Sequence, residues 1–294
     1  MKGSSVLAGS SLGLDPAASV GRWVGVEHEF EVIDGAGVKS DFREILPGLE
    51  RLGIGGLDPG DCHARRCGWG GVVTADGREA EIATPPVSCG PGSAERLEEL
   101  SRTGRAELEE VLVDSTLRGY STHVSVEVDD RVVVRAAKRF VAVYSAPMML
   151  LVDNVASPGI LVRPRRGRLE VCGDFVSGEQ LVAATVFATA GALDCAKHTR
   201  VQWHRQRGSL RCRPEVERAL ERYGWYIDRA AFGTDLYTHG RATRLRSGRT
   251  AQQQLEMCWS VLRPSATEWC SEAEVGAVDR VVEGIAVLPC EVAA

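Results

Sequence analysis

The sequence lacks any long apolar run. No stretch of its 294 residues approaches the ~18 consecutive apolar residues that a membrane-spanning helix needs. The opening stretch, MKGSSVLAGSSLGLD, also lacks the apolar core of a signal peptide, so residues 1–20 are expected to form a disordered leader. Both absences predict a chain that does not insert into a membrane.

The cysteines lack paired spacing. Nine of them, an odd number, are scattered along the chain, which favours free thiols in a reducing compartment and hence a cytoplasmic protein. Cys62, His63 and Cys67 are of metal-binding types, but no second ligand pair follows at zinc-finger spacing. A glycine-rich loop that contains thiols, residues 53–71, is favoured over a zinc site.

The chain as a whole has no excess of positive charge, and it has no P-loop motif. The formal net charge of −5 argues against a nucleic-acid-binding protein, although residues 197–249 carry an excess of eight positive charges. Such a segment indicates an anionic ligand, with Arg241 as a candidate contact, or else a solvated basic surface. Because GxxxxGK[ST] does not occur, any ATP must bind by another architecture.

What the sequence does contain is an acidic strand at Arg22–Ile33, RWVGVEHEFEVI. Glu27, Glu29 and Glu31 alternate with apolar residues, so the three carboxylates share one face of a strand and the apolar residues share the other. The acidic face must therefore look into water, a metal site or a substrate cavity.

Three further strands repeat this design. They are predicted within REAEIATPP at residues 78–86, GYSTHVSVEV at 119–128 and LVRPRRGRLEVCGDF at 161–175. Their polar faces carry Glu79 and Glu81, then His123, then Arg168, Glu170 and Cys172. Taken alone, each strand is most simply an amphipathic strand with a wet face. Together they predict a sheet face on which crowded carboxylates need a cation, and carboxylates with one imidazole suit Mg²⁺ or Mn²⁺.

One domain over residues 21–294 is the simplest organisation, because no repeat, linker or composition break appears. Within it, helices are predicted between and after these strands. A capping box of Ser177 and Gln180 is expected to open a buried helix, and Ser271 with Glu274 a final helix. The expected helices are residues 41–52 with a kink at a proline, 93–118, 135–154, 177–197, 214–223, 255–262 and the final one; GWYIDR at 224–229 is expected to be a loop.

Four blocks in order resemble a known family. GVEHEFEV, EIATPP, GYSTHVSV and RLEVCGDF are similar to the metal- and nucleotide-binding strands of the glutamate-cysteine ligase and carboxylate-amine ligase branch of the glutamine synthetase superfamily. The resemblance covers about residues 22–175. It implies an α+β fold with a curved antiparallel sheet that forms a funnel, and an ADP-forming ligase that activates a carboxylate as an acyl phosphate for attack by an amine.

The resemblance also implies roles for single residues. Glu27, His123 and Glu170 would hold one metal, and Glu29 with Glu81 a second, with Glu79 near the substrate. Arg168 would contact ATP and, with Glu29, support catalysis; Arg163 and Arg165 are further candidates for nucleotide contacts. Implied partners are small-molecule carboxylate and amine substrates, not nucleic acid or membrane, and the oligomeric state stays open, a homo-oligomer included.

The resemblance fails at Cys172, where relatives carry an arginine that grips an amino-acid carboxylate. Arg163 or Arg165 then holds the donor, or the donor is not glutamate, and a specialised amide-forming ligase is expected rather than glutathione synthesis. A nucleophilic Cys172 is disfavoured because acyl phosphate chemistry needs none. Two alternatives remain, namely a metal-dependent phosphotransferase on the same fold and a noncatalytic ligand-binding relative.

Overall fold

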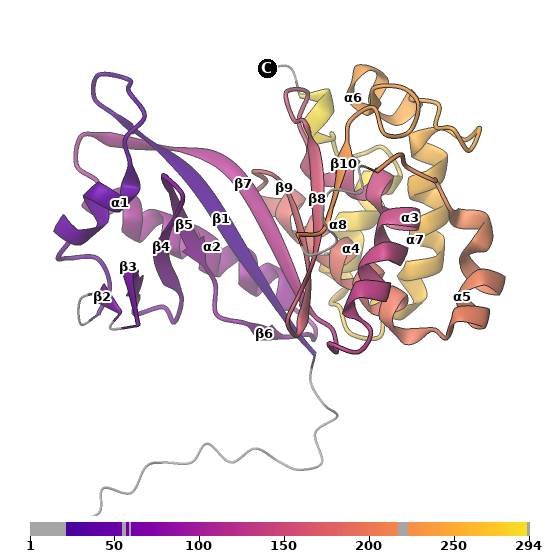
Figure 1. The fold of residues 1–294 in the computed structure, drawn as a ribbon, viewed down its shortest axis with the longest axis horizontal. Helices are drawn as coiled ribbons and strands as arrows, with labels where there is room; N and C mark the ends of the chain where they lie inside the picture. Colours follow the sequence, from indigo (N-terminus) through magenta and orange to yellow (C-terminus); the bar gives the residue numbers. More distant parts are fainter. Residues whose placement is uncertain (1–21, 55–56, 59, 217–222, 293–294) are drawn as a thin grey trace, which may run out of the picture.

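A computed structural model describes residues 22–54, 57–58, 60–216 and 223–292 (Figure 1). The leader predicted at residues 1–20 lies outside the described residues, as does most of the short helix predicted near residues 214–223.

One antiparallel sheet of ten strands organises the described part of the chain. Its central strands, β1 and β7, cross the middle of the molecule as long neighbours (Figure 1). Along the sheet the strands are β10 (Trp225–Asp228), β8 (Gly159–Arg165), β9 (Arg168–Asp174), β7 (Ser115–Glu127), β1 (Trp23–Asp34), β5 (Glu79–Ala83), β4 (Val72–Asp76), β3 (Asp61–Arg66) and β2 (Leu57–Asp58), with β6 (Val87–Ser88) also paired to β1. The mixed α and β architecture with a large antiparallel sheet confirms the predicted fold class.

Helices cover one side of this sheet. α3 packs on β8 and β9, α4 packs on β7 and on α3, and α7 and α8 pack against α4 (Figure 1). α2 covers β1 and β5. The helices are α1 (Phe42–Ile45), α2 (Ser93–Val111), α3 (Val133–Val152), α4 (Gly178–Lys197), α5 (Arg200–Arg207), α6 (Leu236–His239), α7 (Ala251–Ala266) and α8 (Glu272–Val282), with 3-10 turns η1 (Leu46–Gly48), η2 (Gly208–Leu210), η3 (Gly240–Ala242) and η4 (Pro289–Glu291).

The two faces of β1 follow from its alternating sequence. Val24, Val26, Phe30 and Val32 are almost completely buried, which confirms the predicted apolar face. His28 lies on that same face, where its ring is 4.8 Å from the ring of Phe175. Burial lowers the pKa of His28 to about 3, so the imidazole is neutral. The carboxylates beside it in sequence face the other way.

A β-bulge interrupts the pairing of β1 with β7. The register shifts between Glu29 and Phe30, where Gly119 lies opposite Phe30 and Ser121 lies opposite Glu29. A Cβ atom on Gly119 would lie 2.3 Å from ring atoms of Phe175, so only glycine fits there. The bulge thus lets Gly119 pack against Phe175 behind the sheet while Ser121 stays opposite Glu29 on the polar face.

Several predicted boundaries are wrong. The helix expected at residues 93–118 ends at Val111, because Asp114 takes a left-handed turn (φ +65°) that leads into β7. The glycine-rich loop at 53–71 contains β2 and β3, and the loop expected at 224–229 contains β10. Ser177 precedes α4 but its side chain makes no capping hydrogen bond, so the predicted capping box with Gln180 is absent; Gln180 Nε2 bonds the Val287 carbonyl instead.

The capping box of Ser271 and Glu274 is confirmed, and it does more than cap α8. Glu274 is fully buried, and its carboxylate also accepts hydrogen bonds from the backbone N–H groups of Gly92 (2.9 Å) and Ala94 (2.6 Å) at the start of α2. One carboxylate therefore satisfies the N-termini of two helices.

The nine cysteines are all free thiols, as predicted. Among the described residues, no helix is long and apolar enough to cross a membrane.

Candidate active site on the acidic face of the sheet

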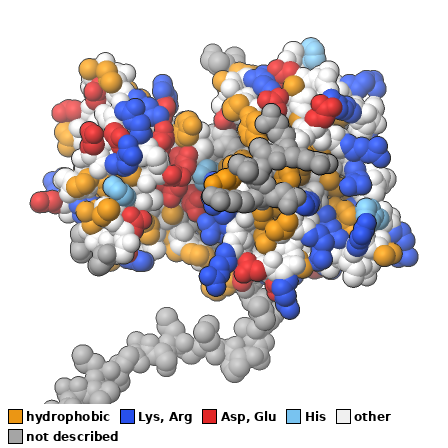
Figure 2. Space-filling view, in the orientation of Figure 1, with side chains coloured by type: hydrophobic (Ala, Val, Ile, Leu, Met, Phe, Trp, Pro, Cys, Tyr) orange, Lys and Arg blue, Asp and Glu red, His pale blue; other side chains and the backbone are white. Residues whose placement is uncertain are grey.

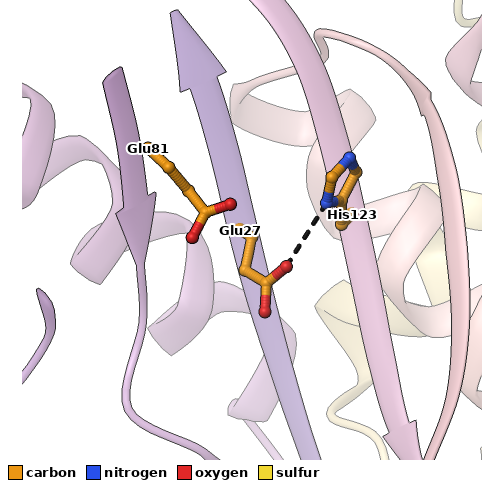
Figure 3. Close-up of side chains that lie close together, drawn as sticks. All are labelled: Glu27, Glu81 and His123. Atoms are coloured by element: carbon orange, nitrogen blue, oxygen red, sulfur yellow. Dashed lines mark hydrogen bonds and ion pairs between the residues drawn. The ribbon is translucent and has the colours of Figure 1, made fainter. Parts of the chain in front are cut away.

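The acidic face of the sheet gathers side chains from three adjacent strands. Strand register places Glu27 of β1 opposite His123 of β7, and Glu29 of β1 opposite Glu81 of β5. Figure 3 shows Glu27, Glu81 and His123 pointing toward one another from these strands. In the space-filling view, acidic side chains gather in the middle of this face (Figure 2).

Glu27, Glu81 and His123 form a first group with metal-ligand geometry. One ligand atom from each lies within 4.8 Å of the others. His123 Nδ1 is 3.3 Å from Glu27 Oε2 and His123 Nε2 is 3.6 Å from Glu29 Oε1, so the imidazole lies between two carboxylates. Burial acts to lower the pKa of His123, but the hydrogen bond to Glu27 and the two negative charges raise it overall.

A second group shares one member with the first. Glu29, Asp76 and Glu81 also offer ligand atoms within 4.8 Å of one another. Ser121 Oγ donates to Glu29 Oε2 at 2.6 Å, which fixes the orientation of that carboxylate. Burial raises the pKa of Glu29, and the nearby Asp76 and Glu79 add to this effect. The two sets of candidate ligands therefore share Glu81.

Glu81 has a strongly raised pKa. Burial, followed by the charges of Glu27 and Glu29, raises its pKa to about 8. A carboxyl group held neutral by its acidic neighbours becomes fully charged once a cation offsets the repulsion. The donor set of carboxylates with one imidazole fits Mg²⁺ or Mn²⁺.

Glu170 lies apart from both groups. The carboxylate is 1% exposed and forms ion pairs with three arginines, the closest of them with Arg163 Nε. Arg165 Nε is 3.2 Å from Glu170 Oε2, and Arg168 Nη2 is 3.7 Å from Glu170 Oε1. The structure thus brings the predicted nucleotide-binding arginines together, but around Glu170 rather than around the other acidic residues.

Cys172 lies between these two clusters. It is opposite His123 in the pairing of β7 with β9, and its side chain contacts Arg163. Burial and then the charge of Glu170 raise the pKa of Cys172 far above that of an ordinary thiol. The thiol is therefore neutral and unsuited to nucleophilic attack, in agreement with the expectation from sequence.

Two other predicted site residues have different partners. Glu79 forms an ion pair with Lys39, which also lies 3.1 Å from Glu31. Arg241 lies among the C-terminal elements, where its guanidinium donates to the carbonyls of Val281 (2.7 Å) and Ala286 (2.9 Å). Its position supports a structural role and places it away from the acidic face.

A hollow of about 310 Å³ begins beside Glu27. Arg166 lines it from the turn between β8 and β9, Arg168 from the start of β9, and Ser125 from β7. Ser125 Oγ and Arg168 Nε are buried and have no hydrogen-bond partner in the part of the chain that the structure describes. Unsatisfied polar atoms next to two arginines indicate that the hollow receives a polar, anionic group.

The chain is similar to part of a larger chain in a solved structure. A crystal structure of the complex between the prokaryotic ubiquitin-like protein Pup and its ligase PafA contains a similar chain, with a TM-score of 0.47 and 13% sequence identity. The match covers 90% of this chain and 64% of that chain, so this chain spans less than two thirds of its length. No protein-family model matches, and no curated protein matches in sequence. A likeness this distant assigns no residue a role, so the function must follow from the site itself.

Two residues of this site escaped the sequence analysis. Asp76 ends β4 in a hairpin whose first residue on β5 is Glu79, and the Asp-Gly pair at 76–77 is a turn signal that was not used to place it. Arg166 belongs to the turn after β8, and only the path of that turn over β1 and β7 places it beside Glu27.

Proposed function

We propose that this chain is an ATP-dependent carboxylate-amine ligase that forms an amide through an acyl phosphate. The observation that carries the proposal is the pair of carboxylate groups joined at Glu81, next to a hollow lined by arginines. Phosphoryl transfer needs positioning and charge neutralisation more than covalent work by side chains, and this arrangement provides both.

Two divalent cations fit the acidic face. Glu27, Glu81 and His123 would hold one, and Glu29, Asp76 and Glu81 the other, with Mg²⁺ or Mn²⁺ as the suitable ions. Bound there, such ions neutralise phosphate oxygens and polarise the transferred phosphoryl group. The hydrogen bond from Ser121 keeps Glu29 aimed at the shared position.

The arginines around Glu170 serve the nucleotide in this proposal. Arg166 and Arg168 line the hollow beside Glu27, where the phosphate chain of ATP would lie. Phosphate oxygens compete with a carboxylate for guanidinium groups, so bound ATP would draw Arg168 away from Glu170. Glu170 would keep its closer ion pairs with Arg163 and Arg165, so the cation contact that the sequence resemblance implies requires these two arginines to turn to the substrates as well.

The substrates would enter near Cys172 and Glu29. Arg163 contacts Cys172, so this guanidinium can bind the carboxylate of the acid in place of the arginine that relatives carry. Glu29, whose pKa is raised, is placed to accept a proton from the substrate ammonium group, which leaves a neutral amine to attack the acyl phosphate and displace phosphate. Glu79 pairs with Lys39 at the edge of this region.

The test is a screen of small carboxylic acids against amines, with ATP and Mg²⁺, for release of ADP and for an amide product identified by mass. A ligase releases ADP only when acid and amine are both present. Release with the acid alone, together with a phosphorylated product, would identify a phosphotransferase instead. Failure of Mg²⁺ with ATP to raise the melting temperature of the wild-type protein would reject the metal-nucleotide site itself.

A further inference from the structure

A second hollow lies behind β1, between α2 and the start of α4. Its volume is about 390 Å³, within the usual range of roughly 300–1,000 Å³ for small-molecule sites. His28 lines it from the apolar face of β1, so the hollow lies on the side of the strand opposite Glu27 and Glu29. It is therefore separate from the acidic face.

Two buried polar atoms on residues that line this hollow have no hydrogen-bond partner among the described residues. They are His28 Nε2 and Ser101 Oγ, on side chains that are 3% and 2% exposed. The His28 ring also interacts with the backbone of Val176, and its low pKa keeps the imidazole neutral. In the neutral tautomer that is protonated at Nδ1, Nε2 carries a lone pair, and no described residue donates a hydrogen bond to it.

Hydrogen-bond donors line the same hollow. α4 begins here at Gly178, and because Ser177 makes no capping bond, the first N–H groups of this 20-residue helix have no side-chain acceptor from their own cap. Arg105 also faces the hollow, and its bond to Glu109 uses only Nε, which leaves the outer guanidinium nitrogens for another acceptor.

The charges around the hollow balance. Arg102 and Arg105 bring two positive charges, and Glu98 and Glu109 bring two negative ones, all from α2. A ligand with net charge would disturb this balance, whereas a zwitterion would preserve it. Phe175 adds an aromatic wall that suits an apolar portion of the ligand.

We propose that this hollow binds a free α-amino acid. The carboxylate would accept from the α4 N-terminus and Arg105, and the ammonium group would donate to His28 Nε2 and Ser101 Oγ. Each of the unsatisfied groups described above then has a partner of the complementary kind. The proposal does not rest on the ligase activity, because the two sites lie on opposite faces of β1.

Two substitutions separate binding from folding. Ser177→Asp would cap α4 with its own carboxylate, so it should stabilise the free protein while it repels a ligand carboxylate. Ser101→Ala removes an unsatisfied buried hydroxyl, so it should leave the free protein at least as stable while it deletes an acceptor for the ammonium. Thr250→Asp, at the N-cap of α7, is the matched control because it adds the same charge at another helix start.

The experiment measures the melting temperature, without ATP or Mg²⁺, in the presence of each protein amino acid, of acetate or of ethylamine. At about 10 mM, one or more amino acids should raise the melting temperature by about 2 °C or more, and acetate and ethylamine by much less. Ser177→Asp should weaken binding at least about tenfold, as should Ser101→Ala, whereas Thr250→Asp should not.

Three outcomes would overturn the proposal: no shift with any amino acid, equal binding by Ser177→Asp and Thr250→Asp, or an equal shift with acetate alone. Glu81→Gln keeps this hollow intact while it changes the acidic face. Amino-acid binding that persists in Glu81→Gln and is lost in Ser177→Asp assigns the ligand to the hollow behind β1, whether or not the ligase proposal holds.

Discussion

Glu81 and Glu27 present carboxylate oxygens within 4.8 Å of each other from adjacent strands. In the metal-free protein this contact is repulsive, and it contributes to the raised pKa of Glu81. We therefore expect this pair to lower the stability of the free chain and to gain stability when a cation binds.

Glu81→Gln tests this relationship. The substitution removes the repulsion, so the metal-free protein should gain about 1–2 kcal/mol in free energy of unfolding at pH 8, while its stabilisation by Mg²⁺ disappears. Thermal unfolding with and without Mg²⁺ measures both effects. Glu79→Gln, on the same strand, should lose well under about 1 kcal/mol and keep the response to Mg²⁺, because Glu79 pairs with Lys39 and the Arg78 backbone and belongs to neither ligand group. A Glu81→Gln protein that still responds to Mg²⁺ would exclude Glu81 as a ligand.

Asp153 predicts a pH dependence of stability. Burial raises the pKa of its carboxyl from 3.8 to about 7, so the folded chain binds more protons than the unfolded chain between these values. Its contribution therefore falls as the pH rises through this window, by about 2–4 kcal/mol, and is constant above it. Asp153→Asn should flatten that slope in denaturant titrations from pH 4 to about pH 8.

Asp235→Asn gives a comparison of opposite sign. Burial acts to raise the pKa of Asp235, but its bonds to Arg229 and to the backbone of Tyr237 lower it overall. This carboxylate stabilises the fold above its ordinary pKa, and the contribution is lost as the pH falls.

If Asp153→Asn keeps the wild-type slope, the Asp153 carboxyl is charged in the folded protein and its assigned protonation is wrong.

Glu274→Ala should be strongly destabilising. The substitution removes the acceptor for N-terminal N–H groups of both α2 and α8 inside the core, at a cost of about 2–4 kcal/mol in the free energy of unfolding. Urea unfolding provides the measurement. Glu272→Ala, in the exposed first turn of the same helix, should cost less than about 1 kcal/mol. Equal losses for the two variants would show that Glu274 acts only through the charge of its own helix.

Arg168→Met addresses the nucleotide contact. If the guanidinium binds the phosphate chain beside Glu27, this variant should raise the KM for ATP about tenfold to hundredfold and leave the Mg²⁺-induced thermal shift in place. Arg78→Met, which removes an exposed arginine near Asp41, should change neither. Nucleotide binding that is unchanged in Arg168→Met would move the phosphate site elsewhere on the sheet.

Strand alternation was sufficient to predict that Glu27, Glu29, Glu81 and His123 share one face. Those strands have an apolar partner face, so burial fixes their orientation, and the structure agrees. The same reasoning put Arg168 beside Glu170 on β9 but could not predict that Arg163 and Arg165 of β8 also pair with Glu170, because alternation within one strand does not specify the register of β8 with β9.

Elements without a clear alternation were missed. β10 is only four residues long and follows a glycine, so the local sequence of GWYIDR resembles a loop until it pairs with β8. Ser177 satisfies the sequence pattern of a helix cap, yet the structure leaves the start of α4 without a side-chain cap. Tertiary contacts decide both cases, and they leave no signal within a short window of sequence.

The two-faced β1 also protects the site from misassembly. Sliding this strand by one residue against β7 would turn Glu27 and Glu29 into the core and expose Val26 and Phe30 to water, at a cost of several kcal/mol. A chain that has buried its apolar residues has therefore already aligned its acidic ones. The same burial that drives folding therefore selects the register of β1 with β7 that places Glu27 and Glu29 on the acidic face.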